Sequence, residues 1–371
     1  MSSSGTDGTE DPLELYDALV MAGKAPGTAE FAAQYPDDVG LLEKIEALEV
    51  LRSELDAMVD HVADDRGERP TELGGYRLVE LIGRGGMGEV FIGEPIDGGR
   101  RCAVKLLRRA SPTAIKRFRR EARLASGLLH PGIACVNDFG VEDGHAYLVV
   151  ELVPGFSLKQ MLAVSAERRQ QPTRRGRHRD AVRQFVLGDD IPPAPRRLTR
   201  SVDLARQVAE ALAHAHAHGV IHRDVKPSNI MVSFDGTTRL IDFGIALESD
   251  RDERITRTGV FIGSCDYAAP EQLRGDKKSI GPWTDTYALG ATLFELLTHR
   301  TPFDGAALGP RIARAAERPP QGARQLNPKI PRALDTLVMR ALHPSPKKRF
   351  RDGGRMAEAM RAWLAKAPAD L

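Results

Sequence analysis

Two short segments in the second half of the chain combine side chains that could transfer a phosphoryl group. The first carries Asp224, Lys226 and Asn229, and the second carries Asp242 ahead of a phenylalanine and a glycine. A carboxylate can receive the proton of a hydroxyl group, and a nearby lysine can neutralise a phosphate. Carboxylate and amide oxygens are also the ligands that Mg²⁺ prefers. Together the two segments are suited to phosphoryl transfer from ATP with the help of a divalent metal ion.

The order and separation of these segments resemble those of the protein kinases. They read His222-Arg223-Asp224-Val225-Lys226-Pro227-Ser228-Asn229 and Asp242-Phe243-Gly244, and the resemblance runs from about Tyr76 to the C-terminus. It is strongest to the bacterial serine/threonine protein kinases of the eukaryotic-like (Hanks) type. The resemblance implies an α+β fold with two lobes: a small β-rich N-terminal lobe with one key helix, and a large, mainly helical C-terminal lobe.

The resemblance implies a role for each of these side chains. Asp224 is expected to accept or orient the proton of the substrate hydroxyl, and Lys226 to neutralise charge on the γ-phosphate. Lysine at this position also implies serine or threonine substrates. Asn229 and Asp242 are expected to bind Mg²⁺, for which Mn²⁺ is a possible substitute. We expect His222 to be structural and not a general base.

A glycine-rich turn is the predicted phosphate grip. Glycine lets the backbone turn sharply and approach phosphates without a Cβ clash. The pattern is weak by itself, because dinucleotide folds and ordinary turns also produce it. Here a strand follows the turn, which favours a hairpin over the nucleotide. The segment consists of Gly83, Arg84, Gly85, Gly86, Met87 and Gly88.

Lys105 resembles the strand lysine that bridges the α- and β-phosphates of ATP. The resemblance implies that Glu121, on the helix that follows, holds this lysine, with a solvated helix charge as the alternative. The expected adenine site lies at the junction of the two lobes. It comprises Val90, Ala103 and Met231 around the purine and backbone groups of Glu151 and Val153 at the hinge.

A loop after Asp242 is the predicted regulatory segment. Thr256 and Thr258 lie where related bacterial kinases phosphorylate themselves. Arg223 directly precedes Asp224, and kinases of that kind often use a phosphothreonine to neutralise this arginine and order the loop. Exposed threonines without a role are the alternative.

The resemblance also predicts structural contacts around this loop. Glu271 is expected to pair with Arg349, and Asp285 to brace the backbone that carries Asp224. His214, His216 and His218 share the end of one helix, where zinc binding and helix packing are both conceivable. No carboxylate or cysteine with zinc-ligand spacing lies beside them, so packing is favoured.

Alternating polar and apolar residues indicate the elements that must position these groups. Strands are predicted at residues 76–81, 89–93, 101–106, 134–139 and 146–152, and a helix at about 112–129. From about residue 157 onward the pattern is mostly helical. We therefore predict a kinase domain at residues 75–367, divided into an N-lobe (75–153) and a C-lobe (154–367).

The first 74 residues differ in charge from the rest. They carry 18 acidic and 5 basic side chains, a net charge of −13, against 48 basic and 33 acidic side chains elsewhere, a net charge of +15. We predict a disordered tail (1–11), an acidic helical accessory region (12–62) and a linker (63–74). The accessory region either closes its apolar face on itself or on the next domain, or it binds a partner or a second copy.

An arginine-rich insert, residues 164–198, exceeds the usual length for kinases. It is either a solvated loop or a docking site for an acidic partner, including this chain's own N-terminal region. Nucleic acid is less favoured, because Phe185 is the insert's one aromatic residue and single strands bind by stacking.

Composition narrows the setting. A hydrophobic fraction of 42% and a charged fraction of 28% are typical of soluble globular proteins. No apolar run approaches the roughly 20 residues that span a bilayer, and the first residues do not resemble a secretion signal. Three widely spaced cysteines without a Cys-x-x-Cys pair favour a reducing cytoplasm.

The sequence thus predicts a serine/threonine protein kinase that transfers the γ-phosphoryl group of MgATP to protein hydroxyls, including its own regulatory loop. The alternative is a catalytically silent pseudokinase that acts as a docking or signalling scaffold. A small-molecule phosphotransferase is disfavoured by the long segment from Asp242 to Glu271. The substrate, the upstream signal and the oligomeric state stay open.

Overall fold

The structure is a computed structural model of the chain, which divides into two compact units. One unit comprises residues 1–65 and 163–191, and the other comprises residues 66–162 and 192–371. The structure describes residues 12, 16, 26–36, 41–42, 45, 70–85, 88–107, 112–142, 144–170, 194–243, 266–304, 315 and 318–367.

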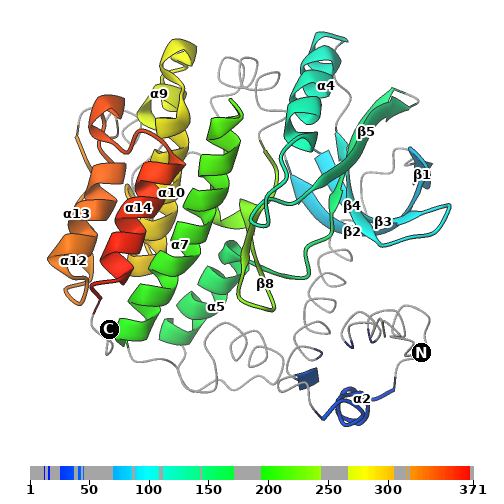
Figure 1. Cartoon of the computed structure of the whole chain (residues 1–371), viewed down its shortest axis with the longest axis horizontal. Coiled ribbons are helices and arrows are strands. Elements are labelled where there is room, and N and C mark those ends of the chain that lie inside the picture. The colour runs from blue at the N-terminus through cyan, green and yellow to red at the C-terminus, as the bar shows by residue number, and fades with distance from the viewer. Residues whose placement is uncertain are drawn as a thin grey trace, which may run out of the picture. The chain divides into compact units, whose positions relative to one another are not determined.

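A six-stranded antiparallel sheet opens the larger unit (Figure 1). Its order is β1-β2-β3-β4-β6-β5. The strands are β1 Glu72–Leu73, β2 Tyr76–Gly85, β3 Gly88–Pro95, β4 Cys102–Leu107, β5 Val136–Glu142 and β6 His145–Glu151. Alternation places Phe91, Val104 and Val149 in one apolar cluster. The five strands predicted from alternation are present.

The end of the predicted linker, residues 63–74, is part of this sheet. Leu73 pairs with Tyr76 across a tight turn and is only 2% exposed, packed in the same cluster as Phe91. The turn contains Gly74 and Gly75, both at positive φ, a conformation that glycine adopts without strain. Residues 63–69 lie outside the described residues.

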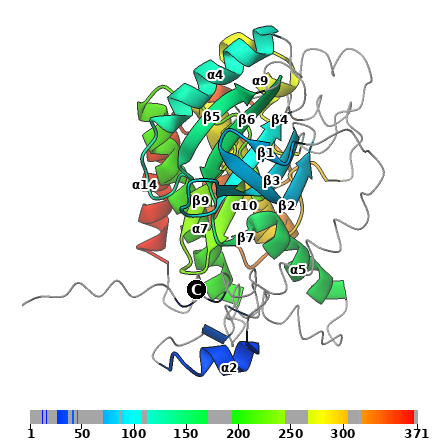
Figure 2. The same ribbon diagram turned by 90° about the vertical axis from the view of Figure 1, so that its right-hand side faces the viewer.

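One helix, α4 Pro112–Ser126, packs against the sheet beside β5 (Figures 1 and 2). The ring of Phe118 meets the ring of Phe139 edge to face, with centroids 6.4 Å apart. The helix ends three residues before the predicted boundary at residue 129, since Gly127 and Pro131 do not favour its continuation. It carries Glu121 toward the second lobe.

A mainly helical lobe follows. Its helices are α5 Leu158–Gln170, α7 Ala194–Ala217, α9 Pro270–Leu273, α10 Pro282–Thr298, α12 Ala323–Leu326, α13 Arg332–Ala341 and α14 Gly353–Leu364. Helices α7, α10 and α14 lie side by side (Figure 1). Gly353 starts α14 directly on α7, where a Cβ would collide with the Ala209 carbonyl oxygen.

A small antiparallel sheet in this lobe borders the six-stranded one. It consists of β7 Gly155–Ser157, β8 Ile230–Ser233 and β9 Thr238–Leu240, in that order. The short turn Pro227–Asn229 precedes β8, and Asp242 follows β9. The two-lobed α+β architecture expected from the sequence is therefore confirmed.

The acidic accessory region has a small core of its own. Tyr16, Phe31, Leu41 and Ile45 are each at most 2% exposed, and the rings of Tyr16 and Phe31 lie 5.0 Å apart. Phe31 lies on α2 Thr28–Ala32. This cluster fits a region that closes on itself. The predicted tail, residues 1–11, lies outside the described part of the chain.

Helices reach into both ends of the predicted arginine-rich insert. Helix α5 continues to Gln170 and α7 begins at Ala194, so residues 164–170 and 194–198 are helical. Residues 171–193 lie outside the described residues. Among the helices that the structure describes, none combines the length and apolar content needed to cross a membrane.

Candidate active site

A buried aspartate braces the loop that carries Asp224. Asp285 of α10 is 0% exposed and accepts hydrogen bonds from the backbone N–H groups of His222 (2.8 Å) and Arg223 (2.7 Å). Arg223 adopts a left-handed backbone conformation with φ of 65°, which this double contact stabilises. The bracing contact predicted for Asp285 is confirmed.

His216 links this brace to the C-terminal helix. Its Nδ1 accepts a hydrogen bond from the Gly353 N–H (3.1 Å), so its Nε2 carries the proton that is donated to Asp285 (2.8 Å). Both ring nitrogens of His216 are thus engaged in hydrogen bonds within the protein. His214 and His218 stack on each other with centroids 4.4 Å apart. The described residues contain no group of three or more His, Cys, Asp or Glu side chains that could hold a metal ion.

The structure brings Asp224, Lys226 and Asn229 into direct contact. Lys226 Nζ lies 2.7 Å from Asp224 Oδ2, and Asn229 Nδ2 donates to the same oxygen (3.1 Å) and to the Asp224 carbonyl (2.9 Å). Asp224 is 8% exposed. Two donors on one oxygen hold the carboxylate in a single orientation at the edge of the loop.

Asp242 is held next to this loop. The N–H of Ile241 donates to the Asn229 carbonyl (3.0 Å), which ties the end of β9 to the turn before β8. Asp242 itself has φ of 58°, a left-handed conformation that residues other than glycine rarely adopt. Burial alone would raise its pKa, but the Lys105 ammonium outweighs that effect, and the net result is a pKa below the usual 3.8. The carboxylate is therefore charged at neutral pH.

The ion pairs around Lys105 differ from the expected ones. Lys105 Nζ lies 2.8 Å from Asp242 Oδ1, while Glu121 Oε1 lies 3.8 Å from the Arg223 guanidinium. A Lys105–Glu121 pair is not among the ion pairs of the described residues, so that expected contact is corrected here. Lys105 is 12% exposed, and a nearly buried ammonium requires an anion, which Asp242 supplies at short range.

The glycine-rich turn joins β2 to β3. Gly88 has φ of 151°, and a Cβ at this position would collide with the Leu106 carbonyl oxygen. The β2–β3–β4 register aligns Gly83 with Val90 and Val90 with Lys105, which puts the glycine hairpin beside the strand lysine. Arg84 pairs with Glu89 across the hairpin (2.8 Å). Gly86 and Met87 lie outside the described residues.

The predicted adenine residues come from both sheets. Ala103 on β4 is aligned with Val150 on β6, and Met231 on β8 is aligned with Arg239 on β9. The chain crosses from one sheet to the other through Val153, which is 8% exposed. Sequence reasoning missed Arg239. The structure aligns this residue with Met231 in the β8–β9 register, which places it near the hinge.

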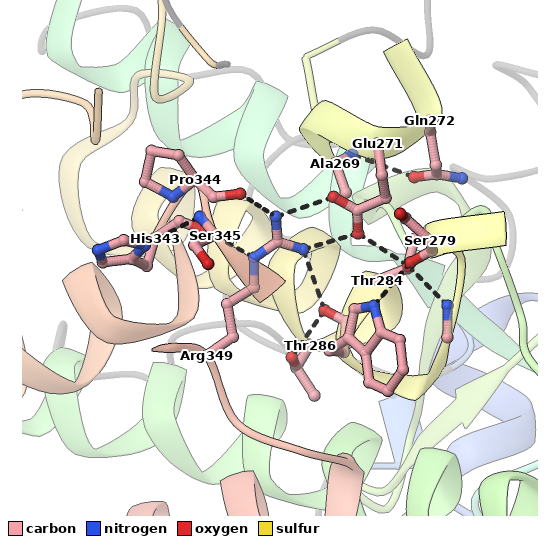
Figure 3. Close-up of polar contacts among 12 residues, drawn as sticks. Ala269, Glu271, Gln272, Ser279, Thr284, Thr286, His343, Pro344, Ser345 and Arg349 are labelled. Atoms are coloured by element: carbon pink, nitrogen blue, oxygen red, sulfur yellow. Dashed lines mark hydrogen bonds and ion pairs between the residues drawn. The ribbon is translucent and has the colours of Figure 1, made fainter. Parts of the chain in front are cut away.

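The predicted Glu271–Arg349 pair is present and fully buried (Figure 3). The two guanidinium nitrogens lie 2.8 and 2.9 Å from the two carboxylate oxygens, and both side chains are 0% exposed. Arg349 also donates to the His343 and Pro344 carbonyls, and Thr284 donates to Glu271 (2.9 Å). Every polar group of this pair thus has a hydrogen-bond partner, which a buried ion pair needs. Next to it, Gln272 donates to the Arg223 carbonyl (2.8 Å), a link that the sequence did not indicate.

His222 is buried and neutral at physiological pH. Its Nδ1 accepts from the Asp224 N–H (3.3 Å), its Nε2 lies 3.0 Å from the Ile241 carbonyl, and its ring packs on Phe243 with centroids 4.6 Å apart. Burial lowers the His222 pKa below 6.5, although the carboxylates of Asp285 and Asp224 act in the opposite direction. The expected structural role fits this geometry.

We predict that His222 makes the folded state less stable in acid. Because its pKa is lower in the folded state, the unfolded chain takes up the proton first, and stability is lost as the pH falls below 6.5. In chemical denaturation between about pH 5 and pH 7, stability should fall less steeply in a His222→Gln variant than in the wild type. The other histidines are the same in both proteins, so parallel slopes would contradict the prediction.

The donor set suits a hard divalent cation and the phosphates of a nucleotide. A carboxylate at Asp242 and an amide oxygen at Asn229 are ligands of the kind that Mg²⁺ takes, and Mg²⁺ commonly completes its shell with waters and substrate phosphates. The amide nitrogen of Asn229 donates to Asp224, and its oxygen accepts from the Ser228 hydroxyl (3.2 Å), so the second lone pair of that oxygen is the donor that would face a metal. Thr256 and Thr258, the predicted phosphorylation sites, lie outside the described residues.

Comparisons of the chain with a family model and with known proteins agree with one another. Residues 76–362 match the family model described as "Protein kinase domain". The chain is 36% identical over 282 residues to the probable serine/threonine-protein kinase PknB of Lactococcus lactis, which covers 75% of this chain and 40% of that protein. It is 38% identical over 303 residues to the serine/threonine-protein kinase PknA of Mycobacterium tuberculosis, which covers 79% of this chain and 62% of that protein. The chain therefore spans less than two thirds of the length of these relatives.

Among solved structures, the kinase domain of Mycobacterium tuberculosis PknI is similar to this chain. The TM-score is 0.57 at 26% sequence identity, and the match covers 79% of this chain and 96% of that one.

Proposed function

The chain belongs to the protein kinase family, and from this premise we propose that it phosphorylates serine and threonine hydroxyls of proteins with MgATP as the donor. The observation that carries the proposal is the contact of Asp224 with Lys226 and Asn229, next to an ionised Asp242 paired with Lys105. These are the acid–base, cationic and metal-binding groups that phosphoryl transfer needs.

In the proposed mechanism each side chain has a distinct task. When bound, MgATP supplies the transferred phosphoryl group, with Mg²⁺, or Mn²⁺ in its place, balancing phosphate charge. Asn229 and Asp242 would hold the metal through oxygen, and Lys105 would be the cation for the phosphates. Asp224, held by two donors, orients the substrate hydroxyl and takes its proton late in the reaction. Lys226 keeps positive charge beside that carboxylate.

We infer that the pairing of Arg223 with Glu121 is a regulatory state. Phosphorylation of Thr256 or Thr258 would provide a dianion that competes for the Arg223 guanidinium more strongly than a single carboxylate at 3.8 Å. Glu121 would then be released from Arg223. The catalytically silent alternative is less favoured, because the chain retains each of the residues whose loss is typical of a silent kinase: Lys105, Glu121, Asp224, Asn229 and Asp242.

Cys102 and Cys135 are free thiols, which fits the reducing cytoplasm in which we place this kinase. The arginine-rich insert and the acidic accessory region have opposite charge, and an acidic protein remains the partner that we propose for the insert.

The test is the intact mass of the protein after incubation with MgATP. We expect mass to increase in steps of about 80 Da, one phosphate each, with the added phosphates located at Thr256 or Thr258 by peptide mapping. Incubation with ATP and a chelator should give no increase, because the metal ligands would lack their ion. Absence of phosphate on the protein and on an added basic protein substrate would argue against the proposed activity.

A further inference from the structure

An ion pair joins the two sheets at the hinge. Arg239 Nη1 on β9 lies 2.7 Å from Glu151 Oε1, at the last residue of β6. Strand β9 belongs to the three-stranded sheet and β6 to the six-stranded sheet, so the pair crosses from one lobe to the other. The side chains of Arg239 and Glu151 are only 29% and 33% exposed, so the pair is partly shielded from water.

The same carboxylate is anchored from a third segment. Glu151 Oε2 accepts a hydrogen bond from the Cys135 N–H (3.3 Å), and the Glu151 N–H donates to the Cys135 carbonyl (2.8 Å). The stretch just before Cys135 pairs with β9: Ala134 N–H donates to the Leu240 carbonyl, and Leu240 N–H to the Gly132 carbonyl. Glu151 is therefore the point where the hinge, the α4–β5 connection and β9 meet.

Arg239 gives up hydration to make this contact. Within the described part of the chain, its Nε is buried and has no hydrogen-bond partner. A hydrogen-bond donor that is buried without a partner costs free energy. An orientation of Arg239 that exposed Nε to water would avoid this cost. The ion pair with Glu151 is the interaction that offsets the loss.

The location makes the pair relevant to nucleotide binding. Backbone groups of Glu151 and Val153 are the expected contacts of the adenine, and Met231, beside Arg239 in the β8–β9 register, is expected to pack on the purine. A change in the tilt of Glu151 would displace the hinge backbone relative to Met231. Arg239 contacts none of the groups that we assign to the reacting phosphate.

We propose that Arg239 is a positioning residue for nucleotide recognition, which acts by holding the Glu151 carboxylate and so fixes the hinge backbone against β8. The inference rests on the proposed function, because it presumes that a nucleotide occupies this junction. It assigns to Arg239 an effect on nucleotide affinity and not on the chemical step.

The test compares Arg239→Met with the wild-type protein. We expect the dissociation constant for MgADP, measured calorimetrically, and the KM for ATP to rise about fivefold, with kcat changed by less than about twofold. Arg239→Lys, which can keep the ion pair, should recover most of the affinity. Arg355→Met removes another ion pair, the exposed Arg355–Glu358 contact on α14, and should leave the affinity unchanged.

Two outcomes would overturn this inference, and a third would overturn the proposed function. Equal affinity of Arg239→Met and wild type for MgADP would overturn the inference while leaving the proposed function intact. A raised kcat at unchanged affinity would also overturn it, because the pair would then restrain motion and not position the hinge. Failure of the wild-type protein to bind MgADP would overturn the proposed function itself. Unfolding temperatures of all three variants would show whether each is folded.

Discussion

Replacing Asp224 with asparagine is expected to remove nearly all phosphoryl transfer while the protein still binds nucleotide. Asparagine has the same shape and can still accept hydrogen bonds from Lys226 and Asn229, so the loop should keep its conformation. It cannot take up the proton of the substrate hydroxyl. Loss of a positioned acid–base group costs about 10²- to 10⁴-fold in rate.

The measurement is phosphate incorporation under single-turnover conditions, together with the MgADP dissociation constant. Asp235→Asn is the matched control, because Asp235 is exposed in the β8–β9 turn and contacts only Thr237 among the described hydrogen bonds. We expect wild-type rates for the control. A rate for Asp224→Asn within about tenfold of the wild-type rate would remove Asp224 from the mechanism that we propose.

Replacing Arg349 with methionine is expected to cause the largest loss of stability. The change leaves the Glu271 carboxylate buried without its cation, and breaking one side of a buried pair costs about 3–5 kcal/mol. The cost arises mainly from the unpaired charge and not from the lost attraction. The carboxylate would keep only the hydrogen bond from Thr284 among its side-chain contacts in Figure 3.

Thermal and chemical denaturation measure this effect. The midpoint temperature of Arg349→Met should fall by on the order of 10 °C, and Arg355→Met, which removes an exposed pair, should change it little. The double variant Glu271→Leu with Arg349→Met should be more stable than the single variant, because no buried charge remains unpaired. Equal stability of the single variant and the wild type would contradict this account of the pair.

The sequence predicted well the contacts that are local in the chain. Asp224, Lys226 and Asn229 lie within six residues, so a single loop conformation brings them together. The strands around Lys105 were predicted because alternation of apolar and polar residues reports directly on which face is buried. The limits of α4 were less certain, since the residues near a helix end satisfy helix and loop equally well.

Contacts within the accessory region were only partly predicted. Leu41 and Ile45 lie four residues apart, a spacing that places them on one helix face, whereas no such spacing links them to Tyr16 or Phe31. Aromatic residues from separate turns of the chain meet in one cluster there. Periodicity identifies one face of one element, and it does not show which other segment covers that face.

The sequence by itself determined which charged groups the proposed active site contains and in what order, because the two segments on which the proposal rests are short and contiguous. Only the tertiary structure decided how those charges pair. Lys105 could take Glu121 or Asp242, and Arg223 could take Glu121 or a phosphate, and the structure pairs Lys105 with Asp242 and Arg223 with Glu121. The energy of an ion pair depends on distance and on local exposure to water, and both are properties of the folded chain and not of residue type.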